Sequence, residues 1–292
     1  DDFNALSSAR QKIVKNALRD FRLSGAELEG PDRERFREIV SELSTLCNQF
    51  DQNLMDATDH WVLDIDSESD LRGLPQSVVE LARQTAKDAS LDGWRFSLQA
   101  PSYIPFMMFC ENRSLRQKMY EAYVTRASDQ GPDAGQFDNG PLMVRILRLR
   151  AEMASLLEFA HYAQYALEGR MAGSAEEVST FLRTLADCAK AAGAEELESL
   201  RHFALEEYGE ENLEAWDIAF YSEKLKQSLY SFSDEAIRPY FPLPKVLEGL
   251  FFVARKLFGV TVRKAVCVSP WHEDVQYFEL LNEDGSVRGC FF

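Results

Sequence analysis

The sequence predicts a mainly α-helical protein, built from antiparallel and crossing helices with a small β-hairpin at the C-terminal end. Along most of the chain, apolar residues recur at steps of three and four, which is the spacing of one face of a helix. Only 15 Gly and 10 Pro occur among 292 residues, too few for the many tight turns of an all-β protein. The period changes to two, as in strands, only after Val275.

The N-terminal part is predicted to contain the longest helix. A first helix, marked by the apolar residues Ile13, Val14 and Leu18, is expected to stop at Gly25, because glycine readily adopts the left-handed conformation that ends helices. A long amphipathic helix then opens near Pro31, since proline fits the first turn, and its apolar positions repeat at helical spacing over 36–54.

Two short extended segments, 61–65 and 94–98, lie on either side of a helix expected over 75–93, and we predict that they pair with each other. Helix returns after residue 101. The polar stretch 128–139 contains two glycines and a proline, so it is predicted to be a loop.

The second half is predicted to be helical up to residue 258. After a helix over 142–157, Ser174 and Glu177 form a capping-box pattern that predicts the start of the next one. Further helices are expected over 195–207, 220–229 and 246–258. A hairpin turn is predicted at Asp284-Gly285, because this dipeptide separates two segments of alternating hydrophobicity.

Composition excludes several classes of partner. The 32 Lys and Arg against 48 Asp and Glu give a net charge of −16, which repels phosphate backbones and anionic lipid surfaces. No run approaches 18 apolar residues, so no membrane span is expected. The five cysteines are odd in number and widely spaced, as in proteins with free thiols, and predict a cytoplasmic or organelle-matrix location.

One dipeptide, His272-Glu273, resembles the start of a zinc-binding His-Glu-x-x-His helix, in which two imidazoles one turn apart hold the metal and the Glu acts as base. The fifth position is Gln276 instead of His, and the segment lies between Pro270 and a strand-like run. A structural or surface role is therefore the favoured interpretation.

Glu198, His202 and Glu206 are spaced four apart and share one helix face, but the many surrounding glutamates indicate a solvated acidic surface. The sequence contains neither a glycine-rich phosphate loop nor a Gly-x-Ser-x-Gly motif. We therefore predict no catalytic residue and no metal-ligating residue in this chain.

The aromatic cluster 216–224 is the most informative motif. It places Phe220 and Tyr221 beside the charged residues Glu223 and Lys224 on a helix, so that a wall of rings with polar neighbours lines a groove. The alternative is that Trp216 and Phe220, four apart, face a core. Both interpretations stay open on the pattern alone.

At this cluster the sequence resembles the thimet-like zinc oligopeptidases, most of all their oligopeptidase A branch. The likeness covers nearly the whole chain and depends on several long strings in the family's order. These strings are Pro101-Ser102-Tyr103, residues 119–123, 125–132, Phe137-Asp138-Asn139, residues 216–224, Tyr230-Ser231, residues 238–241, Trp271-His272 and residues 278–280.

The resemblance implies a mainly helical peptidase that cuts short peptides in a deep channel between two halves, with one zinc ion. The family's zinc ligands are the two His of a His-Glu-x-x-His helix and a later Glu, none of which can be assigned to this chain. Zinc is therefore expected in the intact enzyme and not here. We expect residues 1–292 to be an internal piece that stops before the catalytic region.

The resemblance also suggests a division into three parts. Residues 1–130 form a long-helix N-terminal part, 140–270 a second helical part, and 271–292 the β-hairpin that leads into the missing catalytic region. On this interpretation the chain supplies scaffold and channel wall.

Three residues, Phe220, Tyr221 and Glu223, are the candidates for lining the substrate channel. A weaker expectation is that the segment from Tyr277 to Leu280 is a sheet edge near the channel. Expected partners are short peptides and the missing C-terminal catalytic part. The competing interpretation is a helical binding or scaffold protein that has lost catalysis.

Overall fold

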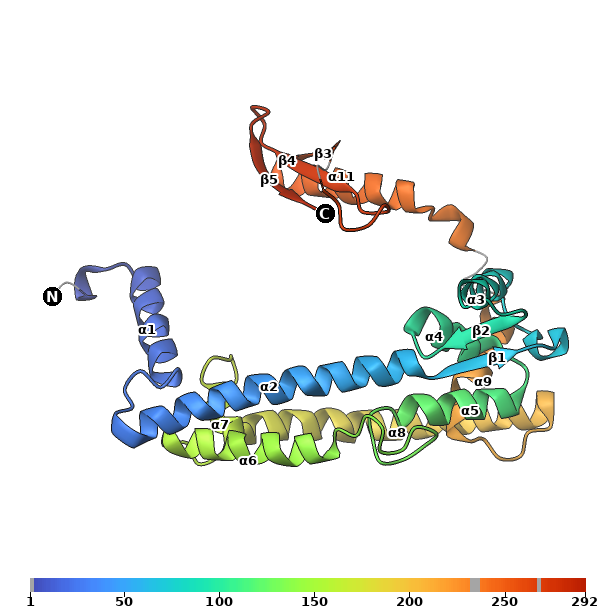
Figure 1. Ribbon diagram of the computed structural model, residues 1–292, viewed down its shortest axis with the longest axis horizontal. Coiled ribbons are helices and arrows are strands. Elements are labelled where there is room, and N and C mark those ends of the chain that lie inside the picture. Colours follow the sequence, from blue (N-terminus) through green and yellow to red (C-terminus); the bar gives the residue numbers. More distant parts are fainter. Residues whose placement is uncertain (1–2, 232–236, 267–268) are drawn as a thin grey trace. The chain divides into compact units, whose positions relative to one another are not determined.

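The computed structural model describes residues 3–231, 237–266 and 269–292, and most of these residues are helical (Figure 1). The mainly α fold that the sequence predicts is thus confirmed. Contacts within the chain divide it into two compact units, Asp1–Leu225 and Lys226–Phe292. The three-part division at 130–140 and 271 stays a prediction.

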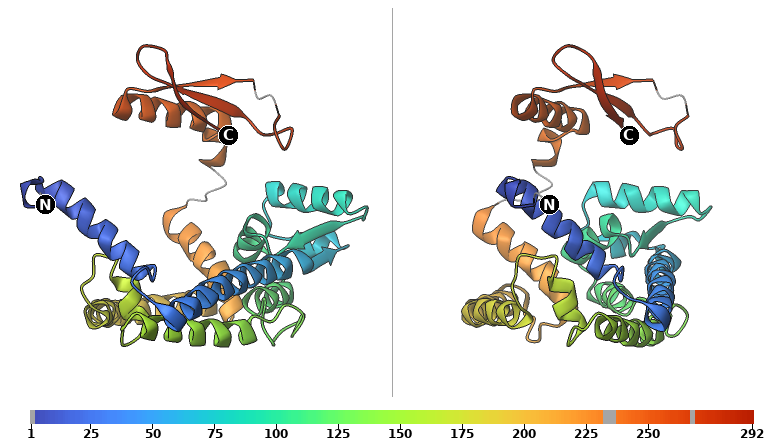
Figure 2. Two further views of the ribbon diagram at one scale, coloured as in Figure 1. Left: turned by 60° about the vertical axis from the view of Figure 1, so that its left-hand side comes forward. Right: turned by 90° about the vertical axis from the view of Figure 1, so that its left-hand side faces the viewer.

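The first unit begins with η1 (Phe3–Ala5) and α1 (Ser8–Leu23), followed by the long helix α2 (Gly30–His60). As predicted, α1 ends just before Gly25, whose φ is +77°. Helix α2 lies alongside α6 (Gly140–Leu156), as the views of Figure 2 show.

These two helices are antiparallel, because ion pairs join the start of one to the end of the other. Arg35 contacts Glu152 at 2.6 Å and Glu42 contacts Arg145 at 2.6 Å. The apolar faces meet in between, in a cluster formed by Phe36, Ile39, Leu149 and Met153. Burial of these faces, more than the exposed ion pairs, holds the pair together.

A second part of the first unit packs around two short strands. β1 (Val62–Ile65) and β2 (Trp94–Ser97) are antiparallel, which confirms the predicted pairing. The elements that follow them or lie between them are η2 (Glu68–Leu71), α3 (Gln76–Asp88), α4 (Ala100–Phe109) and α5 (Arg113–Val124). Helix α3 ends before the predicted Gly93, because Ser90 already adopts a left-handed conformation with φ +58°.

The predicted loop 128–139 contains no helix or strand and is fixed by its last residue. Asn139 is 1% exposed, donates from Nδ2 to the carbonyl of Phe50 at 3.0 Å, and accepts from Nδ2 of Asn53 at 2.9 Å. Gly131 has φ +80°, and a Cβ there would lie 1.9 Å from Oγ1 of Thr125, so only glycine fits.

The rest of the first unit contains α7 (Tyr162–Leu167), the long α8 (Ala175–Tyr208), η3 (Ala215–Asp217) and the start of α9 (Ile218–Tyr230). Ser174 caps α8 as predicted, its Oγ accepting from the Glu177 amide at 3.0 Å, whereas the Glu177 carboxylate accepts from the amide of Gly173. The two helices expected over 174–207 are one continuous helix, whose residues 179–196 are all exposed.

The second unit contains η4 (Arg238–Tyr240), α11 (Leu243–Phe258) and three antiparallel strands, β3 (Thr261–Ala265), β4 (Tyr277–Leu281) and β5 (Val287–Phe291). The predicted hairpin is confirmed, with a turn in which the Asn282 amide donates to the Ser286 carbonyl at 2.9 Å.

One expectation about this sheet is wrong. The segment from Tyr277 to Leu280 is the middle strand and pairs on both sides, with β3 and with β5. It is no edge because β3, which the sequence pattern did not reveal, occupies its other side.

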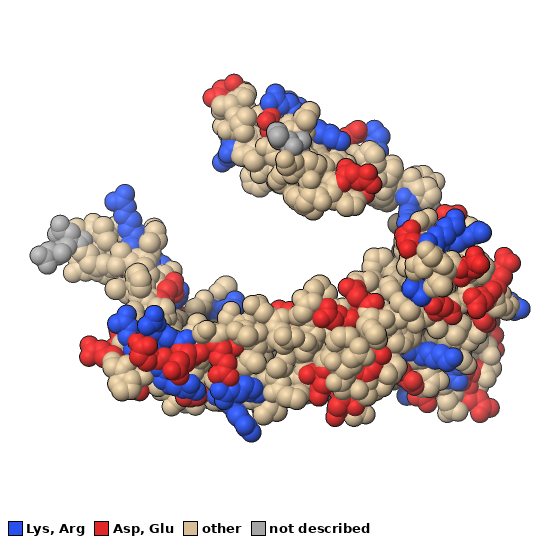
Figure 3. All heavy atoms as spheres, viewed as in Figure 1, with Lys and Arg blue, Asp and Glu red and all other residues tan. Residues whose placement is uncertain are grey.

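Charged side chains of both signs are interspersed over the helices in the view of Figure 3. That face carries no continuous basic band. None of the helices in the described ranges is long and apolar enough to cross a membrane.

Candidate functional site

A cavity of about 400 Å³ opens in the first unit, where the start of α5, the end of α8 and the start of α9 meet. The side chains that line it are Glu111, Arg113, Arg116, Tyr208, Glu210, Phe220, Tyr221 and Lys224. It therefore includes two of the three residues that the sequence predicts for a channel wall.

Asp217, in η3, is fully buried and pairs with two residues of the cavity lining, Arg113 and Arg116. Arg113 donates from Nη2 to its Oδ2 at 2.6 Å, and Arg116 donates from Nη2 to its Oδ1 at 2.7 Å. The amide of Glu214 donates to Oδ2 at 3.1 Å. Burial raises the pKa of Asp217, but the hydrogen bonds from the two arginines and the Glu214 amide outweigh burial and hold that pKa below its usual range.

Arg116 is 1% exposed and has a partner for each of its donor nitrogens. Besides Asp217, it donates from Nη1 to the carbonyl of Cys110 at 2.7 Å and from Nε to the carbonyl of Trp216 at 3.4 Å. Its guanidinium lies 4.1 Å from the ring centroid of Phe220. This one side chain therefore fixes α5 to the start of α9.

Tyr221 forms the aromatic wall together with its neighbours. Its ring lies edge-on to Phe220 at 5.1 Å and to Tyr208 at 5.4 Å between centroids. Burial, together with the nearby carboxylate of Glu210, raises the pKa of the Tyr221 phenol, so the hydroxyl keeps its proton at neutral pH. That hydroxyl has no hydrogen-bond partner in the part of the chain that the structure describes.

The charged groups around the cavity differ in how well they are paired. Glu210 lies 3.4 Å from Nη1 of Arg113. The ammonium of Lys224 lies 5.3 Å from the Phe220 ring and, within the described ranges, has no carboxylate within 4 Å. The Glu111 carboxylate likewise has no cation beside it there. The cavity thus offers unpaired donors and acceptors that suit binding and orienting a polar ligand.

The third predicted residue, Glu223, lies on α9 and is 3% exposed, but it does not line this cavity. Phe220 and Tyr221 also belong to a buried cluster with Leu200 and Ala204 of α8. Both residues thus line a cavity and also belong to a buried cluster. Whether these residues face a peptide channel stays a prediction.

Sequence reasoning missed Arg113, Arg116 and Asp217. Arg113 and Arg116 are three apart, which places both on one face of α5, and this spacing was the only local signal. Their partner lies about a hundred residues further along the chain, where no sequence pattern links them.

The histidine motifs form no metal site in the described residues, where no group of three or more His, Cys, Asp and Glu side chains could hold an ion. His202 pairs with Glu206 at 3.1 Å on the exposed face of α8. His272 lies in a turn outside any helix, as the sequence predicts, and its Nδ1 accepts from the amide of Asp274 at 3.2 Å.

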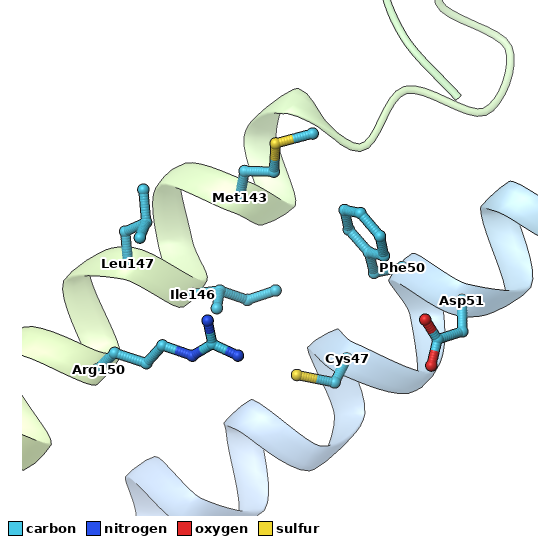
Figure 4. A pocket seen from close by; sticks show the side chains of 7 residues that line it. All are labelled: Cys47, Phe50, Asp51, Met143, Ile146, Leu147 and Arg150. Carbon is cyan, nitrogen blue, oxygen red and sulfur yellow. The ribbon is translucent and has the colours of Figure 1, made fainter. Parts of the chain in front are cut away.

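A second cavity, of about 490 Å³, lies between α2 and α6. Its lining is mostly apolar, and Figure 4 shows Arg150 extending from α6 toward Cys47 of α2. Asp51 is the only other charged residue of the lining. Since few polar groups converge there, the cavity beside Tyr221 is the better candidate for a specific site.

Comparison with known proteins agrees with the resemblance that the sequence motifs predict. The model of peptidase family M3, a family of zinc metallopeptidases, matches residues 106–292. Oligopeptidase A of Salmonella typhimurium strain LT2 and that of Escherichia coli strain K12 are each 46% identical over 292 residues, which is 100% of this chain and 43% of each relative.

A probable cytosolic oligopeptidase A of Arabidopsis thaliana is 36% identical over 100% of this chain and 42% of its own length. The chain therefore spans less than half the length of these relatives. The family match covers well over half of the chain, and the likeness to oligopeptidase A extends through the rest. The chain belongs to peptidase family M3.

Proposed function

We propose that this chain is the non-catalytic helical portion of a zinc metallo-oligopeptidase that hydrolyses short peptides, and that it supplies scaffold and channel wall. The observation that carries the proposal is the 46% identity with oligopeptidase A along all 292 residues. Because the relatives are more than twice as long, zinc binding and bond cleavage are assigned to residues outside these 292. The proposed location is the cytoplasm or an organelle matrix, with neither nucleic acid nor membrane as a partner.

The geometry supports a wall function for the start of α9. Asp217, held by Arg113 and Arg116, fixes the backbone immediately before Phe220 and Tyr221. The rings are therefore positioned before any ligand arrives, which reduces the entropy lost on binding. Glu223 is buried without lining the cavity and is assigned a supporting role.

A chimera tests the proposal. Residues 1–292 replace the aligned segment of the Escherichia coli oligopeptidase A, and cleavage of a short fluorogenic peptide is measured with and without a zinc chelator. We expect chelator-sensitive cleavage by the chimera. The 292-residue chain alone is expected to contain no stoichiometric zinc and to cleave nothing. A folded chimera without activity, or metal-dependent cleavage by the chain alone, would contradict the proposal.

The wall function is tested in the same chimera with Tyr221→Phe and Tyr221→Ala. The first removes only the hydroxyl and the second also removes the ring, so we expect a graded loss of cleavage. Tyr230→Phe is the matched control, because Tyr230 lies on the same helix and is 72% exposed. Unchanged cleavage by both Tyr221 variants would exclude the wall function.

The second candidate is a binding or scaffold protein derived from this family, without catalysis. The cavity beside Tyr221 favours it, since its unpaired polar groups suit ligand binding and include no nucleophile–base pair. On that alternative the chain alone binds peptides, whereas the chimera folds and stays inactive.

A further inference from the structure

The cavity between α2 and α6 is formed by one stripe of side chains on each helix. On α2 the stripe runs from Cys47 to Asp51, and on α6 it runs from Met143 to Arg150, in both cases at helical spacing. Its volume of about 490 Å³ falls within the range of small-molecule pockets, which is about 300–1,000 Å³. The cavity therefore has room for a small molecule.

Polar contacts on both sides of the cavity hold its two walls in place. Toward the start of α2, Glu42 pairs with Arg145 of α6 at 2.6 Å. Toward the end of α2, Nδ2 of Asn53 donates to Asn139 at 2.9 Å, and Nδ2 of Asn139 donates to the carbonyl of Phe50 at 3.0 Å. The cavity is thus formed before a ligand arrives, which reduces the cost of binding.

Most of the lining is apolar, and part of it is open to water. Ile146 is 7% exposed and extends from α6 into the space between the two helices (Figure 4). Met143 and Leu147, which also line the cavity, are 47% and 64% exposed. Covering apolar surface of this kind is favourable in proportion to its area. An aliphatic group therefore fits this lining.

Arg150 supplies a cation to the apolar lining. Its side chain is half-buried, and its guanidinium lies 5.1 Å from the centroid of the Tyr162 ring, a contact that occupies none of its N–H groups with an acceptor oxygen. Arg35 and Arg145, on the same two helices, each pair with a carboxylate. Within the described residues Arg150 has no such partner. Its planar fork of donors matches a carboxylate.

Asp51, the other charged residue of the lining, limits the charge of the ligand. Figure 4 shows Asp51 and Arg150 on opposite sides of Cys47. Asp51 is exposed, so water solvates its carboxylate, but its negative charge still disfavours a dianion nearby. One guanidinium balances one negative charge. The arrangement therefore favours a monoanion.

We infer that this cavity binds an aliphatic monocarboxylate of medium chain length, with the carboxylate at Arg150 and the chain along Ile146 and Met143. The stripe from Met143 to Arg150 is about 10 Å long at about 1.5 Å per residue, which sets the chain length. This site goes beyond the proposed function and does not depend on it, because binding involves neither zinc nor cleavage.

Calorimetric titration of the 292-residue chain with octanoate tests the inference, and we expect saturable binding at one site. Butyrate has the same charge and a shorter chain. Each buried methylene corresponds to roughly fourfold in affinity, so butyrate should bind at least about 10-fold more weakly. Octanol and octylamine keep the chain but lack the negative charge. They should also bind at least about 10-fold more weakly, without charge-assisted hydrogen bonds to Arg150.

Two arginine variants assign the position of the carboxylate. Arg150→Met keeps an apolar stem without the charge, so octanoate should bind roughly 10-fold more weakly or worse, whereas octanol affinity should change little. Arg148→Met is the matched control. It removes one positive charge from an exposed position of the same helix, outside the cavity lining, and should leave octanoate affinity unchanged.

Cys47 reports occupancy from inside the cavity, because its side chain is part of the lining. Bound octanoate should slow the alkylation of Cys47 by iodoacetamide, measured by peptide mass spectrometry of timed samples. Cys188, exposed on α8, is the internal reference and should react at an unchanged rate. In Arg150→Met the same octanoate concentration should protect Cys47 much less.

The inference would be overturned by the absence of saturable octanoate binding, by equal affinity for octanoate and octanol, or by wild-type affinity in a folded Arg150→Met chain. Octanoate binding that leaves Cys47 alkylation unchanged would also overturn it, because the ligand would then lie elsewhere. Circular dichroism checks the fold of each variant.

The same alkylation measurement distinguishes other occupants of the cavity. If Cys47 of the ligand-free chain became protected as the protein concentration rose, a second copy of the chain would fill the cavity. If Cys47 of the ligand-free chimera resisted alkylation at every concentration, a segment outside these 292 residues would fill it. Either result would overturn the inference.

Discussion

Replacing Asp217 by alanine is expected to destabilise the first unit strongly. The change removes a fully buried carboxylate that accepts hydrogen bonds from Arg113 and Arg116. The guanidinium of Arg116, 1% exposed, then keeps its charge without a counter-charge. Breaking a buried pair by removing one partner costs about 3–5 kcal/mol. For a unit of this size, that corresponds to a Tm lower by about 6–20 °C.

The stability that the Asp217 carboxylate contributes should also depend on pH. The variant Asp217→Asn measures this dependence, because asparagine has nearly the same shape as aspartate but carries no charge. The folded-state pKa of Asp217 lies below its unfolded value of about 3.9, so the charged form stabilises the fold above that value. This stabilisation disappears as the pH falls through the lower, folded-state pKa. The difference in unfolding free energy between wild type and Asp217→Asn should therefore be full at pH 7 and shrink below about pH 4.

Thermal and urea unfolding of the 292-residue chain, followed by circular dichroism, provides the measurement. Arg37→Ala is the control, because its ion pair with Glu34 is exposed on both sides, at 71% and 68%. That variant should be indistinguishable from wild type. The reasoning would be refuted if Asp217→Ala lowered the unfolding free energy by less than about 1 kcal/mol. It would also be refuted if the difference in unfolding free energy between wild type and Asp217→Asn stayed constant from pH 7 to pH 3.

Three further predictions concern other parts of the first unit. Leu149→Ala should lower the unfolding free energy by about 2–5 kcal/mol in urea titrations, because Leu149 is fully buried, whereas Leu147→Ala, at a side chain 64% exposed, should change it little. Asn139→Asp should cost about 1–3 kcal/mol, since the carboxylate cannot donate to the Phe50 carbonyl; a normal Tm would contradict this. Burial raises the pKa of the Cys110 thiol to about 11, so iodoacetamide at pH 8 should alkylate the exposed Cys188 first, as mass spectrometry of timed samples would show.

Local structure could be predicted from the sequence where one or two residues determine it. Gly25 ends α1, Ser174 caps α8 and Asp284-Gly285 forms the hairpin turn, and each depends on backbone preferences that act over a few residues. The sequence pattern predicted two helices over 174–207, but α8 is continuous, and its interior Gly193 costs only about 1 kcal/mol.

Features that depend on distant residues could not be predicted in this way. Strand β3 is short, follows directly after α11, and is recognisable only through its pairing with β4. Of the aromatic motif 216–224, Phe220 and Tyr221 line the cavity, and their place in a peptide channel stays a prediction. The arginines that position them are contributed by α5, so their function becomes visible only after folding.

The long exposed stretch of α8 has a consequence for local opening. Residues 179–196 make few tertiary contacts in the first unit, so only helical hydrogen bonds oppose their unfolding, and helices without packing are marginal. The turn that contains Leu200 and Ala204 is instead held against α9. Amide hydrogen exchange should therefore fall steeply along this one helix, from fast in its first half to slow near Ala204. The wall of the cavity would then stay closed to exchange while the preceding turns open and close.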